Sequence, residues 1–405
     1  MAHATGEDYP LKLRRTKGSY ITRSHQYSST VQRIYFDNAA TTALIPEVLE
    51  AMWPFLSEKF GNPSAIYSYG RETKLAIEQS RKTVARLLHA NPGEIFFTSG
   101  GTESTNTAIT AAIRDLGCTR IITSAIEHHA TLHATQFVQQ RDNIELSLVQ
   151  LLADGHVDLE HLERLLRQDA GNTLVTLMHA NNEIGNLLDI EKAGSLCRQY
   201  GAFFHCDTVQ TVGHYPLNLK ELQVDFINAA AHKFHGPKGV GLLYVNERIR
   251  IHPLLHGGAQ ERNLRAGTEN IYGIVGMAKA LELSLANLEA DRPYILELKN
   301  YMAGQLRHAF PAIRFNGDWN GKSLYTILNV SFPRTPKSDM LLFNLDIHGI
   351  CASGGSACAS GANTVSHVIS ALDAGQDYVP VRFSFSRQNT PEEVDRVVTV
   401  LKELL

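Results

Sequence analysis

The 405-residue sequence has few cysteines, no surplus of charge of one sign and no long apolar run. Its 38 basic residues stand against 41 acidic ones, so no excess of positive charge is present to neutralise the phosphates of a nucleic acid. No uninterrupted apolar stretch reaches membrane-spanning length, and the first residues lack the apolar core of a secretory signal. We therefore expect a soluble protein of small-molecule chemistry, with no direct nucleic-acid partner and no membrane partner.

The five cysteines lie at positions 118, 197, 206, 351 and 358. Their odd number and wide spacing fit neither a disulfide framework nor a paired zinc motif, which favours a reducing, cytoplasmic location. A disulfide between Cys351 and Cys358 remains an alternative. His129 and His133 have the spacing of a metal pair on a helix, but no third ligand stands nearby in sequence, so no metal site is expected.

Short runs of strand-forming residues alternate with helical patterns between about residues 45 and 285. Several runs are apolar almost throughout, as in strands that helices cover on both faces. The pattern predicts an α/β fold with a mostly parallel central sheet sandwiched by helices, and catalytic residues just past the strand ends. The predicted strands are 95–98, 120–123, 145–149, 174–178, 202–206, 226–230 and 240–245.

The pattern changes after residue 290, to a helix from about Arg292, strands at 326–332 and 381–386, and a final helix. Thr390 has the place of the N-cap of that last helix, and Glu393 that of its capping-box partner. We predict a small α+β C-terminal domain over 289–405 and a large domain over 33–288, whose first residues could pack on the small one. Residues 1–32 are polar and loosely basic, and read either as an extension or as a mitochondrial-type targeting segment.

A glycine-rich turn follows the strand predicted at 95–98. Gly100, Gly101 and Thr102 precede a helical run, so free N–H groups, the positive end of the helix dipole and a hydroxyl are expected together, as at a phosphate site. An ordinary turn with a helix cap would give the same residues. Other phosphate ligands have to decide between the two interpretations.

Lys233 and Asp207 each follow a predicted buried strand. Lysines are rarely buried, and desolvation favours the neutral amine, which is the nucleophilic form. Lys238 lies in a Gly-Pro-Lys-Gly turn and reads as a surface residue. Asp207 suits the carboxylate that keeps the ring nitrogen of a pyridoxal cofactor protonated, although a turn or N-cap aspartate is the ordinary alternative.

Together with further motifs, these residues resemble class V aminotransferases, and among them the cysteine desulfurases. The resemblance spans roughly residues 33–405, and many motifs in one order make it specific. It implies a fold-type I PLP-dependent transferase, with pyridoxal 5′-phosphate (PLP) as cofactor and a homodimer as assembly. The motifs are at 36–42, 61–64, 127–129, 181–185, 207–210, 232–239, 265–268 and 353–361.

The resemblance also implies roles for single residues. Lys233 would carry the cofactor, and Asn182, Arg382 and Asn38 would surround the substrate, with the planar guanidinium matching a carboxylate. Taken alone, His128 could be a core histidine and Arg382 a solvent-facing residue. The implied cofactor residues are Gly101, Thr102 and His232 at the phosphate, His128 on the ring, Asn182, Asp207 and Gln210 around the ring, and Thr268 at the phosphate of the partner subunit.

Cys358 lies in a run of small residues, 353–361, with no bulky side chain to fix it in a core. The resemblance implies that Cys358, with Lys233 and His128, is catalytic and receives sulfur from L-cysteine as a persulfide. An acceptor protein, such as an iron–sulfur scaffold or a sulfur carrier, would take that sulfur, because the run resembles the longer-loop type that serves iron–sulfur cluster assembly and tRNA thiolation.

Two positions depart from the family pattern: Ala230, where many members have a phosphate-binding serine, and Tyr67, where a histidine is common. Loss of the serine would remove one hydrogen bond to the phosphate. Two alternative functions stay open. One is a selenocysteine lyase or another class V transaminase, and the other is a sulfur-transfer scaffold without turnover.

Overall fold

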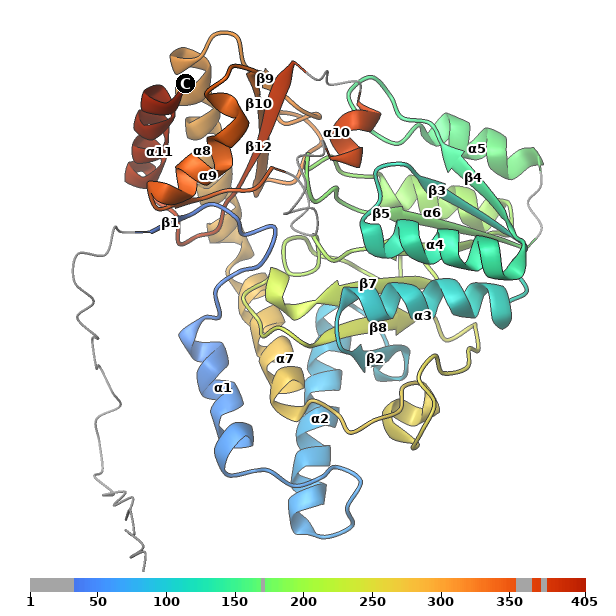
Figure 1. Cartoon of the computed structure of the whole chain (residues 1–405). Helices are drawn as coiled ribbons and strands as arrows, with labels where there is room; N and C mark the ends of the chain where they lie inside the picture. Colours follow the sequence, from blue (N-terminus) through green and yellow to red (C-terminus); the bar gives the residue numbers. More distant parts are fainter. Residues whose placement is uncertain (1–32, 169–171, 355–365, 373–376) are drawn as a thin grey trace, which may run out of the picture.

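The computed structural model describes residues 33–168, 172–354, 366–372 and 377–405. The N-terminal extension, residues 1–32, and Cys358 lie outside the described residues. A large sheet with its helices forms one side of the molecule, and a small sheet with α8, α9 and α11 forms the other (Figure 1).

The large sheet has seven strands in the order β2-β8-β7-β6-β5-β3-β4. β8 runs antiparallel to both of its neighbours, and the other neighbouring pairs are parallel. This mostly parallel sheet, flanked by helices, confirms the predicted fold class. The strands are β2 (Ile95–Thr98), β3 (Arg120–Ser124), β4 (Glu145–Val149), β5 (Thr173–Met178), β6 (Phe203–Asp207), β7 (Phe226–Ala230) and β8 (Gly241–Val245).

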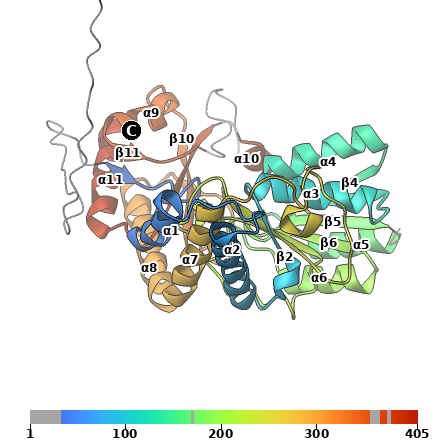
Figure 2. The same cartoon turned by 90° about the horizontal axis from the view of Figure 1, so that it is seen from below.

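Helices cover both faces of this sheet, as Figure 2 shows from below. Neighbouring residues of a strand point to opposite faces, so Ile121 packs in one apolar cluster, near α3 and α4, and Ile122 in another, near α2, α5, α6 and α7. Burial on both faces explains the continuous apolar runs. The helices of this part are α1 (Pro46–Ser57), α2 (Ser68–Leu87), α3 (Gly101–Arg114), α4 (His129–Asp142), α5 (Leu159–Gln168), α6 (Ile190–Gln199) and α7 (Ile271–Ala286), with 3₁₀ turns η1 (Pro92–Glu94), η2 (Ala231–Lys233) and η3 (Gln260–Asn263).

The small sheet is antiparallel, in the order β12-β10-β9. The chain also enters here, because β1 pairs in parallel with β11, and Phe36 is fully buried against Phe383 and Phe385. The predicted domain boundaries stay a prediction. The elements of this part are β1 (Ile34–Tyr35), α8 (Leu288–Ala309), β9 (Arg314–Phe315), β10 (Ile327–Pro333), η4 (Ser338–Met340), α9 (Leu341–Ile347), β11 (Ile350–Cys351), α10 (His367–Ala371), β12 (Tyr378–Ser384) and α11 (Pro391–Leu404).

Local sequence signals predicted the start of α11 correctly but missed the start of α8. The capping box of α11 is present, with the Thr390 side chain accepting from the N–H of Glu393 and the Glu393 side chain accepting from Thr390 N–H. The start of α8 was predicted at about Arg292, but the helix begins at Leu288, directly after α7. Asn287 serves both helices, as C-cap of α7 and N-cap of α8.

Among the described residues, no single helix is both long and apolar enough to cross a membrane. α7 and α8 pass such a test only as a pair, and they meet at a bend of 74°. The four cysteines in the described part of the chain, at 118, 197, 206 and 351, are free thiols.

Candidate active site

The segments that follow five strands meet at one edge of the large sheet. β3, β5, β6 and β7 are parallel, and β2 points the same way because two antiparallel pairings separate it from β7. The carboxyl end of such a sheet is where ligands bind in folds of this class. Every cofactor residue predicted from the sequence, Thr268 apart, follows one of these strand ends.

The glycine-rich turn leads directly into α3, whose first two residues are Gly101 and Thr102. A side chain at Gly101 would come within 2.7 Å of Val209, so glycine lets the start of α3 pack against the segment that follows Asp207. The first N–H groups of a helix have no partner within it, and the positive end of its dipole lies there. The turn therefore presents free N–H groups at the sheet edge, as a phosphate site requires, and the phosphate site itself stays a prediction.

Lys233 ends the 3₁₀ turn η2, just past β7. Its Nζ donates to the backbone oxygens of Ala39 and Ala40, at 2.6 and 2.9 Å. Lys238, in contrast, is exposed, as the sequence indicated. The neighbouring His232 is half-buried, and its Nδ1 lies 3.2 Å from Thr41 Oγ1. Burial, with the charges of Lys233 and Lys238, lowers the pKa of His232 to about 4.

His214 contacts the backbone of Lys233, and it was missed by the sequence analysis. Its Nε2 lies 3.1 Å from the Lys233 backbone oxygen, and its Nδ1 lies 3.2 Å from the Tyr325 hydroxyl. A carbonyl oxygen can only accept, so Nε2 carries the proton. Burial lowers the pKa of His214 to about 4, which keeps the ring neutral. Nothing in the sequence next to His214 signals a contact that the fold alone creates.

Asp207 is the last residue of β6 and is 6% exposed. Its Oδ1 accepts from the N–H of Val209 at 3.0 Å, so the carboxylate shapes the turn, but no helix follows for it to cap. Gln210, also buried, donates to the Ala39 oxygen at 3.1 Å, the same oxygen that accepts from Lys233. Asp207 thus presents a buried carboxylate beside the residues that surround Lys233.

His128 is the N-cap of α4, and its Nδ1 accepts from the N–H of Ala130 at 3.1 Å. The proton of the neutral ring is therefore on Nε2. Burial lowers the pKa of His128, the positive charge of Lys233 lowers it further, and the negative charge of Asp207 opposes both. The structure brings these three side chains within electrostatic reach of one another.

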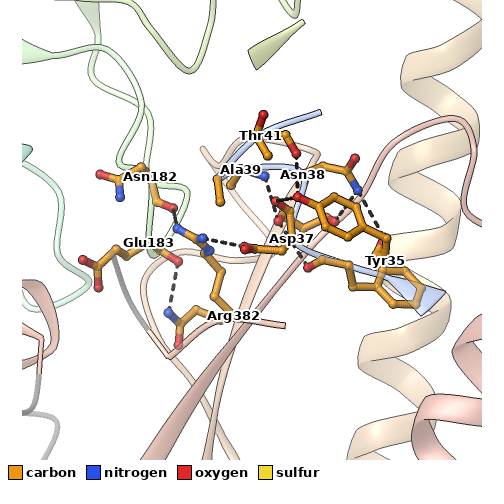
Figure 3. Close-up of polar contacts among 12 residues, drawn as sticks. Tyr35, Asp37, Asn38, Ala39, Thr41, Asn182, Glu183 and Arg382 are labelled. Atoms are coloured by element: carbon orange, nitrogen blue, oxygen red, sulfur yellow. Dashed lines mark hydrogen bonds and ion pairs between the residues drawn. The ribbon is translucent and has the colours of Figure 1, made fainter. Parts of the chain in front are cut away.

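Arg382 lies on β12 and is only 1% exposed, so the solvent-facing alternative is wrong. Nη1 donates to the backbone oxygen of Asn182 and Nη2 donates to Oδ1 of Asp37, each at 2.7 Å (Figure 3). Its buried Nε has no hydrogen-bond partner in the described part of the chain. The side-chain amide of Asn38, also buried, donates to the backbone oxygen of Ser384 at 2.9 Å. The residues predicted to surround the substrate carboxylate thus lie where the two sheets meet.

Asp37 was missed as a site residue, although it stands beside Asn38 in a motif that the sequence analysis singled out. Its carboxylate forms an ion pair with Arg382. An aspartate within this motif could have indicated a site residue. Its partner, Arg382, is on β12, more than 300 residues later in the sequence. The ion pair fixes one edge of the guanidinium, and no residue that the structure describes accepts a hydrogen bond from Nε.

Thr268 lies apart from the other predicted residues. It is exposed, in the loop between η3 and α7, and lines a cavity of about 120 Å³ with Ser99 and Gly239. This position leaves its side chain open to a second chain. Arg265, in the same loop, forms an ion pair with Glu103 of α3 at 2.9 Å, which links the loop to the glycine-rich turn.

Three residues of η3, directly before the loop that carries Thr268, have left-handed backbone. Glu261, Arg262 and Asn263 have φ of 44°, 57° and 67°, which costs free energy for residues other than glycine. The buried side chain of Glu261 accepts two hydrogen bonds from Arg81, at 2.8 and 2.9 Å, and one from Phe97 N–H at 2.8 Å. This buried ion pair holds the loop against α2 and β2.

The described residues fit PLP, the cofactor that the motifs implied. A lysine amine, a buried aspartate and a helix N-terminus with a hydroxyl residue face one sheet edge, where an aldehyde, a ring nitrogen and a phosphate would each find a suitable group. The buried Arg382 adds a donor set of the kind that binds a carboxylate.

Comparisons with known proteins agree with this geometry. A family model for aminotransferase class-V matches residues 34–397. The cysteine desulfurase IscS of Dictyoglomus turgidum is 42% identical over 378 residues, which cover 92% of this chain and 95% of that protein. The cysteine desulfurase IscS of Methanosarcina thermophila is also 42% identical, over 93% of each chain.

Solved structures give the same result. A NifS-like protein superposes with a TM-score of 0.84 at 36% identity, over 92% of this chain and 98% of that one. The apo structure of a cysteine desulfurase from Thermococcus onnurineus NA1 gives a TM-score of 0.81 at 27% identity, over 92% of this chain and 94% of that one. The resemblance predicted from the motifs is confirmed. The chain belongs to the aminotransferase class-V family and, within it, to the group that contains the cysteine desulfurases.

Proposed function

We propose that this chain is a PLP-dependent cysteine desulfurase that forms L-alanine from L-cysteine and retains the sulfur as a persulfide on Cys358. One observation carries the proposal. The backbone of Ser353, just before the segment that contains Cys358, pairs with the backbone of Arg382, the residue suited to bind the substrate carboxylate. The segment that contains Cys358 therefore starts beside the expected substrate site.

Chain length supports the same assignment. Cys358 lies outside the described residues, but it follows Gly354 by four residues. Four residues span at most about 14 Å. Gly354 in turn follows Ser353, which is bonded to Arg382, so the thiol is close enough to reach a substrate held there. Of the four described cysteines, only Cys351 is also near Ser353, and it is held in β11, paired with β1.

The residues proposed to hold PLP are Gly101, Thr102 and His232 at its phosphate, and His128, Asn182, Asp207, Gln210 and Lys233 around its ring. Bound there, PLP supplies an electron sink for the substrate. Lys233 moves the proton at the substrate Cα, and Asp207 holds a proton at the ring nitrogen. His128, whose Nε2 carries a proton, is placed to act as a proton donor. Arg382 and Asn182, with Asn38 beside them, orient the substrate carboxylate.

The sulfur-transfer step balances without a further reactant. The Cys358 thiolate attacks the substrate sulfur, an S–S bond forms, and the Cβ–S bond breaks with its electron pair going to carbon, which takes up a proton. The net change converts L-cysteine and one enzyme thiol into L-alanine and one enzyme persulfide. Both sulfur atoms are oxidised by one electron each, and Cβ is reduced by two.

The test is mass spectrometry of the PLP-loaded protein after treatment with L-cysteine. We expect one added sulfur atom on Cys358 and an equal amount of L-alanine. Cys358→Ser should abolish both and keep the visible absorbance of bound PLP, whereas the matched variant Cys351→Ser should behave like the wild type. Alanine formation that survives Cys358→Ser would contradict the assignment of Cys358.

The same experiment addresses the alternatives. A selenocysteine lyase would prefer L-selenocysteine and would not need Cys358, and a transaminase would release a keto acid. A scaffold without turnover would form no alanine at all. Substrate preference therefore identifies the lyase, a keto-acid product identifies the transaminase, and the absence of any product identifies the scaffold.

We also propose a homodimer in which Thr268 reaches the cofactor phosphate of the partner subunit. Large apolar side chains of α1 and of the segment between α1 and α2 are exposed, among them Trp53 (50%), Phe60 (74%) and Ile66 (89%). A monomer rarely exposes so many together. The persulfide would pass to an acceptor protein with a free thiol, in a reducing, cytoplasmic compartment.

A further inference from the structure

Two glutamates next to proposed site residues are fully buried, and the proposed chemistry does not use them. Glu127 precedes His128, and Glu183 follows Asn182. Burying a carboxyl group is costly unless it has a partner. Each has one side-chain oxygen without a hydrogen-bond partner among the described residues, Oε2 of Glu127 and Oε1 of Glu183. The burial of these two carboxyl groups therefore calls for a structural or functional explanation.

The first turn of α10 contacts both positions, the side chain of Glu183 and the backbone of Glu127. The Ser366 hydroxyl donates to Glu183 Oε2 at 2.5 Å, and His367 Nε2 donates to the backbone oxygen of Glu127 at 2.9 Å. Ser366 also caps the helix, because its oxygen accepts from Val368 N–H at 3.1 Å. One serine side chain therefore starts α10 and attaches it to the segment that follows β5.

Apolar contacts join the same three segments. Val368 and Ile369 of α10 are buried in one cluster with Ile126, which precedes Glu127, and Ile184, which follows Glu183. The short helix is thus fixed to both segments that carry site residues. α10 has only five residues, so this attachment, rather than its own helical hydrogen bonds, determines where it lies.

We propose that the hydrogen bond from Ser366 to Glu183 is a positioning contact for sulfur transfer, because it fixes the C-terminal end of the segment that carries Cys358. Ser366 follows Cys358 by eight residues, and the other end of that segment is fixed by the pairing of Ser353 with Arg382. Both attachment points are thus at the substrate site. The inference rests on the proposed role of Cys358 and adds Ser366 and Glu183 to it.

The test compares single-turnover persulfide formation in variants of the PLP-loaded protein. Ser366→Ala removes the contact, and a misplacement near 1 Å is enough to slow such a step by about a hundredfold, so we expect a loss of roughly tenfold to a hundredfold. Ser366→Thr keeps the hydroxyl and should retain most of the rate. Ser370→Ala, at an exposed serine of the same helix, is the matched control and should equal the wild type.

Loss of the helix cap has to be separated from loss of the contact. Glycine replaces serine at an N-cap with little cost, whereas alanine does not. Ser366→Gly should therefore be as slow as Ser366→Ala if the contact to Glu183 matters. A normal rate in Ser366→Gly would show that only the cap matters and would overturn the proposal.

Two further measurements distinguish positioning from general damage to the site. PLP content and the KM for L-cysteine should stay within about twofold of the wild type, since the groups that bind them are intact, while persulfide formation falls. A parallel loss of all three, or an unchanged persulfide rate in Ser366→Ala, would overturn the proposal. A wild type that forms no persulfide on Cys358 would overturn the proposed function as well.

Discussion

Glu127 is a buried acid whose ionisation should be visible in the stability of the protein. Burial raises its pKa to about 8, and the negative charge of Asp207 adds to the effect, against hydrogen bonds from Ser124 and the Met178 backbone. The folded state therefore holds a proton that the unfolded chain loses near pH 4.5. The contribution to stability is complete below that pH and is lost as the pH rises to about 8.

Glu127→Gln should remove this pH dependence. Between about pH 5 and 8, the free energy of unfolding of the wild type should fall relative to that of the variant by a few kcal/mol. Urea unfolding at a series of pH values measures it. Glu297→Gln, at an exposed position of α8, should follow the wild type. A constant difference between wild type and Glu127→Gln across this range would contradict the raised pKa.

At the scale of residues, the sequence predicted the groups that stand directly at strand ends. Lys233 and Asp207 follow buried strands, and the sheet edge brings them together because parallel strands end on the same side. Asp37 and His214 were missed for the opposite reason. Their partners, Arg382 and the backbone of Lys233, come from segments that only the complete fold places beside them.

Among the elements, the left-handed run at Glu261–Asn263 depends most on a single interaction. Three residues in this conformation cost about 1 to 2 kcal/mol each. The bidentate pair of Arg81 and Glu261, both with side chains 2% exposed, offsets this cost. Glu78, which also bonds Arg81, has a side chain that is 37% exposed.

Glu261→Gln should lower the free energy of unfolding by about 3 to 5 kcal/mol, because it leaves the buried guanidinium of Arg81 without its buried charged partner. Glu78→Gln, which removes the exposed partner of the same arginine, should cost less than about 1 kcal/mol. Chemical denaturation of both variants gives the comparison. Equal losses would mean that burial of the pair does not matter.

Element ends were predictable where the signal is local and were missed where it is not. The Thr390 and Glu393 pattern predicted the start of α11, since an N-cap and its partner are three residues apart. No glycine marks the left-handed run, so the sequence there looks ordinary. α8 begins earlier than predicted because Asn287 ends α7 and starts α8 without any loop between them.

For the whole molecule, the proposed dimer predicts a difference between two exposed phenylalanines. Phe60→Lys, between α1 and α2, should produce monomers and lower activity, because Thr268 would no longer reach a partner's cofactor. Phe343→Lys, on α9 of the small part, changes a residue that is 57% exposed and should leave a dimer. Sedimentation velocity measures the outcome, and a dimeric Phe60→Lys protein would place the interface elsewhere.

The layered arrangement of the molecule was predictable because it follows from repeated alternation of strands and helices. The pairing of β1 with β11 was not, since a two-residue strand has no pattern of its own. The direction of β8 was also open from sequence, because an apolar run is the same in either orientation. The β1–β11 pairing and the direction of β8 both depend on contacts between segments that are far apart in the sequence.

The pairing of β1 with β11 also affects how the chain is made. A ribosome releases Ile34 more than 300 residues before its partner, Ile350, and before Ser384, which bridges Asp37. The segment that holds Asp37 and Asn38 has to wait, with Phe36 exposed, while the large sheet can already form. The substrate site therefore forms only after β12 has been made, so a chain truncated before β12 would build the sheet edge for the cofactor but not the place for the amino acid.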